Sequence, residues 1–247
     1  MTKRAIKIET LDGTAPAAIF TAEGHAGGQS RPGVILYMDA FGPRPALDGM
    51  AERLAAAGYT VLLPDLFYRY GAYGPFDTAT AFSNAESRDV LMGMLGNTTQ
   101  DMTIRDSAGF LDALAAEGVT GPVGTVGYCM GGARALNAAA AYPERVAAAA
   151  SFHGGGLASD APDSPHRRAA DIRARVYVGS AGVDKSFPPE QSARLAQALR
   201  EAEVDHIIEN YIGMAHGWAV SDHGVYDPEG SERHWKRLLS FFEESLG

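Results

Sequence analysis

The stretch Pro122-Val123-Gly124-Thr125-Val126-Gly127-Tyr128-Cys129-Met130-Gly131 decides the fold of this chain. Its apolar first half predicts a strand, and residues 133–142, which are rich in good helix formers, predict the helix that follows. Between them lies a G-x-nucleophile-x-G turn, whose glycines let the backbone bend tightly and leave a reactive side chain exposed. A free cysteine is more often a small buried hydrophobe. The order of strand, turn and helix instead favours Cys129 as a nucleophile.

Strands and helices alternate on both sides of this turn. Apolar runs predict strands at residues 5–9, 17–22, 33–38, 60–63, 122–126, 146–152, 175–179 and 205–211. Helical patterns cover residues 47–57, 102–117, 133–142, 190–202 and 231–246. Most strand runs are continuously apolar, which is typical of a parallel sheet covered on both faces. We therefore expect an α/β fold with a mostly parallel central sheet, helices on both faces, and ligands at the carboxyl ends of the strands.

The chain shows no linker or change of composition that would divide it, so we expect one domain over residues 1–247. Residues 68–96 are less regular and contain several glycines and aromatic residues. This segment predicts a covering loop with short helices, and such loops often shape pockets.

The composition excludes several classes of function. A net charge of −9 argues against binding to nucleic acid, whose phosphates need a basic surface. The single cysteine forbids an internal disulfide and fits a reducing compartment. The first ten residues have no apolar signal-peptide core, and no later apolar run is long enough to cross a membrane. We expect a cytoplasmic protein that does not bind membranes.

A nucleophilic thiol needs a base, and His216 is the best-placed of the seven histidines. It lies in a glycine-bounded loop after the last predicted strand and before the final helix, where α/β-hydrolases carry their histidine. His223 is the main competitor. The histidines expected to be solvated are His25, His166, His206 and His234.

The base needs an acid that orients it, and Asp184 follows the strand predicted at residues 175–179. An ordinary turn aspartate is the structural alternative, since such loops favour aspartate. Asp160 and Asp163 are rivals, but they follow the preceding strand. The order of nucleophile, acid and histidine favours Asp184.

An oxyanion hole requires two preorganised backbone N–H groups. Met130, directly after the nucleophile, is expected to supply one, and Ala40, in the loop after the strand at 33–38, the other. His153-Gly154-Gly155-Gly156 is similar to a lipase oxyanion motif, but that motif works from a loop before the nucleophile. Here it follows the nucleophile, so we expect a pocket-lining or structural turn.

Taken together, these residues resemble the dienelactone hydrolase family, a cysteine branch of the α/β-hydrolases, over nearly the whole chain. The resemblance is carried by Asp39-Ala40-Phe41-Gly42, Pro64-Asp65-Leu66-Phe67, Val126-Gly127-Tyr128-Cys129-Met130-Gly131-Gly132, Asp184 with Phe187-Pro188, Gly213-Met214-Ala215-His216-Gly217, and the closing helix at residues 235–242. The cysteine turn with its following glycines is highly specific, whereas Pro64-Asp65-Leu66 is common among α/β-hydrolases.

The resemblance implies a Cys129–His216–Asp184 triad that hydrolyses a small ester or enol-lactone through an acyl-enzyme, with no metal or organic cofactor, in a monomer or homodimer. Family members also hold a carboxylate near the resting thiol, which helps to generate the thiolate when substrate displaces it. Asp39 matches that position, although the family commonly has glutamate there. A permanent ion pair between Cys129 and His216 is the alternative.

Substrate specificity is expected to differ from that of the family's namesake. Dienelactone-cleaving members bind the substrate carboxylate with arginines, and Arg88 matches one of them or is a surface arginine paired with a neighbouring acid. The second arginine is replaced by Val220. Because a bidentate carboxylate clamp is then missing, we expect a neutral and more apolar substrate than the dienelactone. Trp218 and Phe41 are candidates for lining its pocket.

The sequence is also compatible with two other functions. A pocket that stabilises a tetrahedral oxyanion can also accept phosphorus esters, so promiscuous hydrolysis of phosphotriesters is one alternative. A catalytically silent α/β-hydrolase that serves as a binding protein is the other.

Overall fold

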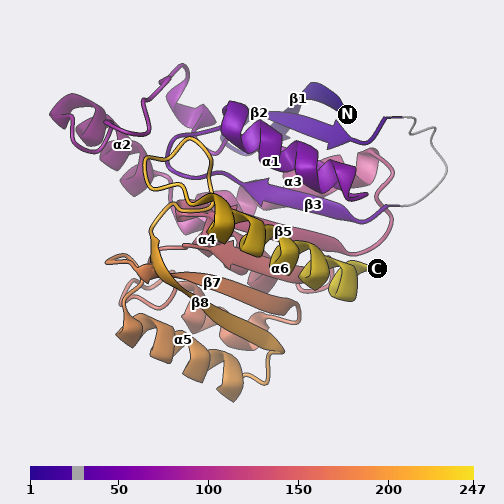
Figure 1. The fold of residues 1–247 in the computed structure, drawn as a ribbon. Coiled ribbons are helices and arrows are strands. Elements are labelled where there is room, and N and C mark those ends of the chain that lie inside the picture. Colours follow the sequence, from indigo (N-terminus) through magenta and orange to yellow (C-terminus); the bar gives the residue numbers. More distant parts are fainter. Residues whose placement is uncertain (24–30) are drawn as a thin grey trace.

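The structure, a computed structural model, describes residues 1–23 and 31–247 (Figure 1). Within these residues one sheet has the strand order β1-β2-β4-β3-β5-β6-β7-β8. The strands are β1 (Thr2–Thr10), β2 (Gly13–Thr21), β3 (Gly33–Tyr37), β4 (Thr60–Pro64), β5 (Val123–Tyr128), β6 (Val146–Phe152), β7 (Arg175–Val183) and β8 (His206–Ala215). The pairs β1–β2 and β2–β4 are antiparallel, and every neighbouring pair from β4 to β8 is parallel.

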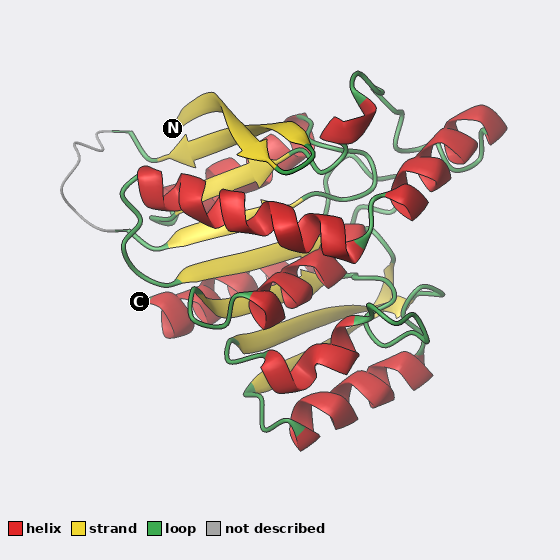
Figure 2. Ribbon diagram, turned by 180° about the vertical axis from the view of Figure 1, so that it is seen from behind, coloured by secondary structure: helices red, strands yellow, loops and turns green. Residues whose placement is uncertain are grey.

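Helices cover both faces of this sheet, which is why its central strands are buried and mostly apolar. Every residue of β3, β4 and β5 is buried. On one face lie α1 (Pro45–Ala56) and α6 (Pro228–Leu246), and on the other lie α3 (Gln100–Ala116) and α4 (Met130–Ala141) (Figures 1 and 2). In the described part of the chain, no helix is long and apolar enough to span a membrane.

The remaining helices lie nearer the edges. A 3-10 helix, η2 (Pro165–Asp171), packs against both α4 and α5 (Pro189–Glu201). A short 3-10 helix, η1 (Tyr68–Tyr70), begins the covering segment, and α2 (Ala85–Asn97) ends it and projects from the body of the molecule (Figure 1).

All eight predicted strands are present, and all five predicted helices are present with earlier starts. Three of them begin at Pro45, Pro189 and Pro228, because proline fits the first turn of a helix, where its missing N–H is not needed. The largest difference lies in the covering segment, where α2 is a 13-residue helix rather than a short one. The Asn84 side chain caps it by accepting a hydrogen bond from the Ser87 amide.

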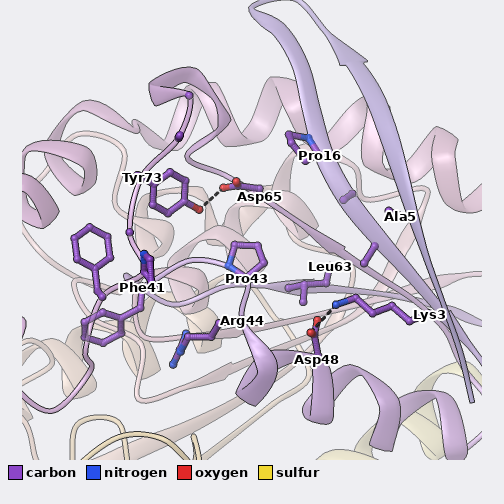
Figure 3. A pocket seen from close by; sticks show the side chains of 17 residues that line it. Lys3, Ala5, Pro16, Phe41, Pro43, Arg44, Asp48, Leu63, Asp65 and Tyr73 are labelled. Atoms are coloured by element: carbon purple, nitrogen blue, oxygen red, sulfur yellow. Dashed lines mark hydrogen bonds and ion pairs between the residues drawn. The ribbon is translucent and has the colours of Figure 1, made fainter.

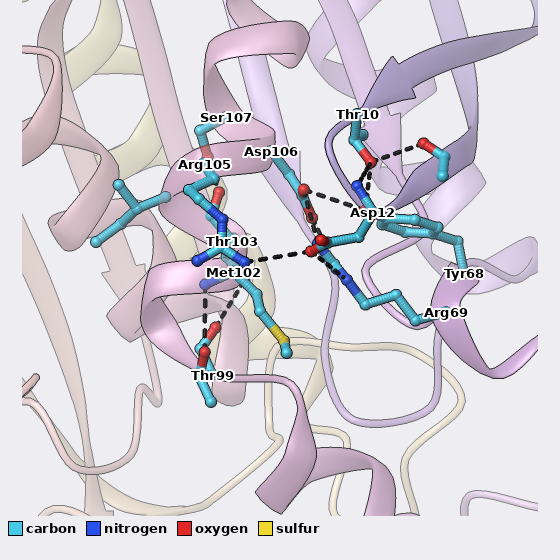
Figure 4. A network of polar contacts seen from close by, with 12 residues as sticks. Thr10, Asp12, Tyr68, Arg69, Thr99, Met102, Thr103, Arg105, Asp106 and Ser107 are labelled. Atoms are coloured by element: carbon cyan, nitrogen blue, oxygen red, sulfur yellow. Dashed lines mark hydrogen bonds and ion pairs between the residues drawn. The ribbon is translucent and has the colours of Figure 1, made fainter.

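Ion pairs fix the start of the covering segment. Arg69 of η1 donates hydrogen bonds to both carboxylate oxygens of Asp106 on α3, at 2.8 and 2.9 Å (Figure 4). The same guanidinium reaches Asp12, in the turn between β1 and β2, at 2.7 Å. Asp106 is buried, so this contact neutralises a charge that would otherwise be costly to bury. The network therefore ties η1 both to the edge of the sheet and to α3.

Candidate active site

Cys129 lies at the tip of the turn between β5 and α4, at the carboxyl edge of the sheet. Its backbone has a φ of 55° and a ψ of −118°, a conformation that costs a residue with a Cβ about 1–3 kcal/mol. Gly127 makes the turn possible, because a Cβ at this position would clash with the Gly131 carbonyl. The thiol is partly exposed, and the turn presents it at the point where helix and strand meet.

A buried histidine supports the turn from within. The amide of Cys129 donates to Nδ1 of His153 at 3.1 Å and to the carbonyl of Phe152 at 3.2 Å. Burial, together with the nearby histidines, lowers the pKa of His153 well below its usual value, so its imidazole is neutral. His153 is the first residue of the structural turn predicted at residues 153–156, and its φ is 39°. His153 therefore helps to hold the backbone of Cys129 in its strained conformation.

His216 and Asp184 come together from the ends of neighbouring strands, since one follows β8 and the other closely follows β7. His216 Nδ1 lies 2.7 Å from Asp184 Oδ2. The second carboxylate oxygen of Asp184 accepts hydrogen bonds from the amide and hydroxyl of Ser186, at 2.8 and 2.6 Å. The Ser186 hydroxyl also lies 3.1 Å from His216 Nδ1. Sequence reasoning missed Ser186, whose only signal is its place two residues after the acid.

The electrostatics of this pair favour a charged imidazole. Burial disfavours the Asp184 carboxylate, but hydrogen bonds from His216 and Ser186 outweigh it and lower the pKa of Asp184. Burial also disfavours the imidazolium of His216, but the interactions with Asp184 and Cys129 outweigh it and raise the pKa of His216 to about 10. At neutral pH the site therefore presents an imidazolium that interacts with the thiol of Cys129.

The start of α4 packs directly against the end of β3. A Cβ on Gly131 would clash with the Tyr37 carbonyl and lie 2.6 Å from the Met38 carbonyl. This close approach brings the first turn of α4 next to the loop that carries Ala40. The amides of Ala40 and Met130 donate no hydrogen bond to any described residue, and no side chain caps the amino terminus of α4. Free N–H groups of this kind attract negative charge.

Asp39 lies in the same loop and is held by several partners. It is fully buried, and Arg44 donates to both of its carboxylate oxygens, at 2.7 and 2.8 Å. His223 Nε2 lies 3.1 Å from Asp39 Oδ2, and the Phe41 amide donates to Oδ1. Burial disfavours the carboxylate, but His223 and Arg44 outweigh it and lower the pKa of Asp39. Arg44 also pairs with Asp222, so the network joins the loop to the segment after His216.

The predicted substrate-binding residues are spread over three environments. Arg88 is exposed on α2, where it pairs with Asp89 at 3.5 Å. Trp218 is fully buried, and its ring contacts His153 and Tyr211. Phe41 is buried in the loop that carries Ala40, and its ring contacts Phe82 and His223 edge to face. Their contact with substrate stays a prediction.

Of the described histidines expected to be solvated, His166 and His206 are partly exposed and His234 is not exposed at all. His234 is fully buried and bonds to the Tyr128 hydroxyl at 2.8 Å and the Ser231 carbonyl at 3.0 Å. The expectation that it is solvated is wrong, because its place on α6 faces the sheet. Burial lowers the pKa of His234 to about 3. His25 lies outside the described residues.

A cavity of about 520 Å³ borders the loop that carries Ala40, and Phe41 and Arg44 are among the residues that line it (Figure 3). Tyr73 lines the same cavity and packs closely on the loop, since a Cβ on Gly42 would lie 2.5 Å from the Tyr73 hydroxyl. That hydroxyl donates to Asp65 at 2.6 Å, as Figure 3 shows. Tyr73, which bonds to Asp65, therefore packs against the loop in addition to the contacts that Arg44 and His223 make with Asp39.

A strained turn that carries Cys129 after β5, with a bonded aspartate–histidine pair beyond β7 and β8, is the arrangement typical of an α/β-hydrolase fold. Solved structures share this fold. A putative dienelactone hydrolase from Klebsiella pneumoniae subsp. pneumoniae MGH 78578 superposes with a TM-score of 0.85 at 23% identity, over 98% of both chains. A dienelactone hydrolase-like promiscuous phosphotriesterase, P91 from metagenomic libraries, superposes with a TM-score of 0.79 at 26% identity, over 100% of both chains.

Residues 18–246 match the Dienelactone hydrolase family, and the chain belongs to that family. A carboxymethylenebutenolidase from Rhodococcus opacus is 29% identical over 246 residues, which cover 98% of this chain and 92% of that protein. A putative carboxymethylenebutenolidase from Synechocystis sp. is 27% identical over 237 residues, which cover 92% of this chain and 91% of that protein. The protein is thus a carboxymethylenebutenolidase-like hydrolase, as the resemblance in its sequence predicts.

Proposed function

We propose that the protein hydrolyses a small ester or enol-lactone by covalent catalysis at Cys129, with His216 as base and Asp184 as its orienting acid. The observation that carries the proposal is the His216 imidazole, which bonds to Asp184 at 2.7 Å and whose raised pKa depends on both Asp184 and Cys129. A nucleophile beside an oriented base is the arrangement that acyl transfer requires.

The proposed reaction has two halves. The Cys129 thiolate attacks the ester carbonyl, and the amides of Ala40 and Met130 stabilise the oxyanion that forms. Collapse of this intermediate breaks the C–O bond, and the leaving alcohol takes a proton from His216. Neutral His216 then removes a proton from water, which attacks the thioester and releases the acid and the thiol. Each oxyanion donor contributes about 3 kcal/mol in enzymes that use this device.

The resting thiol is proposed to pair with His216 rather than with Asp39. Asp39 accepts hydrogen bonds from Arg44, His223 and its own loop, which use both of its oxygens. A carboxylate engaged in this way is more suited to hold the loop of Ala40 than to take a proton from a thiol. His216, in contrast, has one nitrogen on Asp184 and interacts with Cys129 through the imidazolium.

The substrate is proposed to differ from the dienelactone of the family's namesake. Val220 replaces one expected carboxylate-binding arginine and is fully buried, while Arg88 is exposed and pairs with Asp89. A comparison of kcat/KM for short p-nitrophenyl esters, neutral enol-lactones and a carboxylated dienelactone tests this directly. A preference for the carboxylated dienelactone would overturn it.

Thiol acylation is tested with Cys129→Ala, assayed on p-nitrophenyl acetate and butyrate beside the surface variant Ser240→Ala. We expect turnover to be lost in the first variant and kept in the second. Mass spectrometry of acid-quenched wild-type enzyme should find one acyl group on Cys129, the only cysteine. Undiminished turnover in Cys129→Ala would refute the proposal.

Hydrolysis of phosphotriesters is a second candidate activity. It is favoured by the 26% identity, over the full chain, to a structure whose name describes a promiscuous phosphotriesterase. In this reaction the thiolate would displace the aryl alcohol from phosphorus, and water would then cleave the P–S bond. Paraoxon turnover that is present in the wild type and absent in Cys129→Ala would support it, and no turnover in the wild type would exclude it.

A further inference from the structure

One acid in the wall of the cavity of about 520 Å³ has no cation beside it. Asp65 directly follows β4 and is half-buried. It accepts hydrogen bonds from the Tyr73 hydroxyl at 2.6 Å and from the Phe67 amide at 2.8 Å. Both donors are neutral and both bind Oδ1, so Oδ2 accepts no hydrogen bond from the residues that the structure describes. Asp65 therefore keeps one free oxygen at the cavity.

The electrostatics of this acid differ from those of the neighbouring Asp39. Burial raises the pKa of Asp65, because it disfavours the carboxylate more than the two hydrogen bonds favour it. The pKa of Asp39 is lowered, since His223 and Arg44 outweigh its burial. A partly buried carboxylate without a positive partner is stabilised when a cation approaches it. Asp65 is therefore suited to a ligand that carries positive charge.

The two cations that line the cavity already have acids of their own. Lys3 binds Asp48 at 2.6 Å, and Figure 3 shows this pair apart from the hydrogen bond between the tyrosine and the free acid. Arg44 lies between two carboxylates, with Asp39 at 2.7 Å and Asp222 at 2.6 Å. Because each of these charges is paired, neither cation compensates the free acid, and their repulsion of a positive ligand is reduced.

The rest of the cavity wall suits the apolar part of a small molecule. Apolar and aromatic side chains predominate in it, among them Leu63, Phe41, Pro43, Tyr73 and Phe76. The rings of Tyr73 and Phe76 stack with their centroids 6.4 Å apart. Aromatic faces attract cations in addition to covering apolar surface. The volume, about 520 Å³, lies in the range of pockets that bind small organic molecules.

We propose that this cavity is a binding site for a small organic cation, an ammonium ion on an apolar body. The ammonium group donates to Asp65 Oδ2, and the apolar body lies against the aromatic wall. Cys129, His216 and Asp184 do not line the cavity, so the site is separate from the proposed catalytic residues. The proposal therefore does not depend on the proposed ester hydrolysis.

The first experiment compares three probes of similar shape and different charge. The wild type is titrated in a calorimeter with 2-phenylethylammonium chloride, 2-phenylethanol and sodium 3-phenylpropionate. We expect one ammonium ion to bind per chain, with a Kd at least about tenfold lower than that of the alcohol, because its hydrogen bond to Asp65 joins two charged groups. The anion should bind more weakly than the alcohol. If the ammonium ion shows no saturable binding, or binds no better than the alcohol, the proposal is overturned.

The second experiment removes the charge of the acid and keeps its shape. In Asp65→Asn the side-chain oxygen can still accept from Tyr73 and Phe67, whereas the negative charge and the free oxygen are lost. We expect the Kd of 2-phenylethylammonium to rise about tenfold or more, and that of 2-phenylethanol to stay the same. The matched control is Asp101→Asn, an exposed acid on α3, which should bind the ammonium ion as the wild type does. Unchanged ammonium binding in Asp65→Asn would overturn the proposal.

Two further measurements locate the ligand, and they decide if Asp65→Asn does not fold. Ala5 is exposed on β1 and lines the cavity, so Ala5→Phe should fill part of it and weaken ammonium binding. Alkylation of Cys129, the only cysteine, with iodoacetamide blocks the catalytic thiol and should leave ammonium binding unchanged. If binding survives fully in Ala5→Phe, or is lost on alkylation, the cation binds elsewhere and the proposal fails.

Discussion

Two aspartate–histidine pairs lie beyond the carboxyl ends of the sheet's parallel strands, and they differ in what else binds the carboxylate. Asp184 meets His216 at 2.7 Å and otherwise accepts only the neutral donors of Ser186. Asp39 meets His223 at 3.1 Å and is also held by the guanidinium of Arg44 at both oxygens. Both carboxylates are buried, but only Asp39 has a permanent cation as its partner.

We expect this difference to separate an acid that charges its histidine from an acid that holds a loop. The charge of Asp184 has no guanidinium partner, so it stabilises the imidazolium of His216 and raises the pKa of that histidine. The charge of Asp39 is already neutralised by Arg44, and the result is a rigid connection between the Ala40 loop and the segment after His216. Both acids are buried, although Asp184 meets Nδ1 of His216 and Asp39 meets Nε2 of His223, and we expect the extra cation to decide the role.

The largest expected effect comes from exchanging each acid for its amide. Asp184→Asn should lower kcat for p-nitrophenyl butyrate by about 10³- to 10⁴-fold, because the amide no longer orients His216 or stabilises its charged form. Asp39→Asn should lower it about tenfold or less, since only the loop is loosened. Steady-state kinetics of the two variants give the comparison. If kcat falls more in Asp39→Asn than in Asp184→Asn, Asp39 is the acid that activates the thiol.

The second effect concerns stability and should appear only in the Asp39 pair. Arg44→Met leaves the Asp39 carboxylate buried without its cation, and we expect a loss of about 3–5 kcal/mol in the free energy of unfolding. Urea unfolding measures it. The double variant Arg44→Met/Asp39→Asn should recover part of this loss, because the unpaired charge is removed. If the double variant is no more stable than the single one, the guanidinium acts through packing alone.

The pH dependence of stability should mark the Asp184 pair. The pKa of His216 is raised from 6.5 to about 10, so the folded state binds the proton on His216 more tightly than the unfolded state does. This contribution is fully present below pH 6.5 and is lost as the pH rises toward 10. The stability difference between the wild type and His216→Gln, from urea unfolding, should therefore be largest near pH 6 and shrink by pH 9.5. A constant difference over this range would mean that His216 is neutral throughout.

The fold was predictable because its signals are local. Apolar runs, most of them continuous, marked the strands, and the glycines around Cys129 marked the turn where a Cβ on Gly127 would clash with Gly131. The placement of His216 and Asp184 after neighbouring strands followed from chain order alone. Parallel strands end at one edge of the sheet, so residues 32 positions apart lie within hydrogen-bonding distance.

Other features of the structure depend on contacts between distant residues, which no local sequence pattern predicts. Arg44 gives no sign in the sequence that it binds Asp39 and Asp222 at once. The buried position of His234 depends on which face of α6 meets the sheet, and a histidine fits either face. The free oxygen of Asp65 becomes visible only when its neighbours are placed around it. Ser186 belongs to this group, because its hydroxyl matters only through its distance to two other side chains.

The smallest effect tests that serine. In Ser186→Ala the Asp184 carboxylate loses one hydroxyl donor and keeps its backbone donor and His216. A hydrogen bond to a charged group contributes about 1.5 kcal/mol, so we expect kcat to fall roughly tenfold with little change in KM. The matched control is Ser240→Ala, whose hydroxyl on α6 contacts only Glu244 among the described residues. If Ser186→Ala loses stability but keeps its kcat, the serine shapes the loop without orienting the acid, and the two pairs would differ in Arg44 alone.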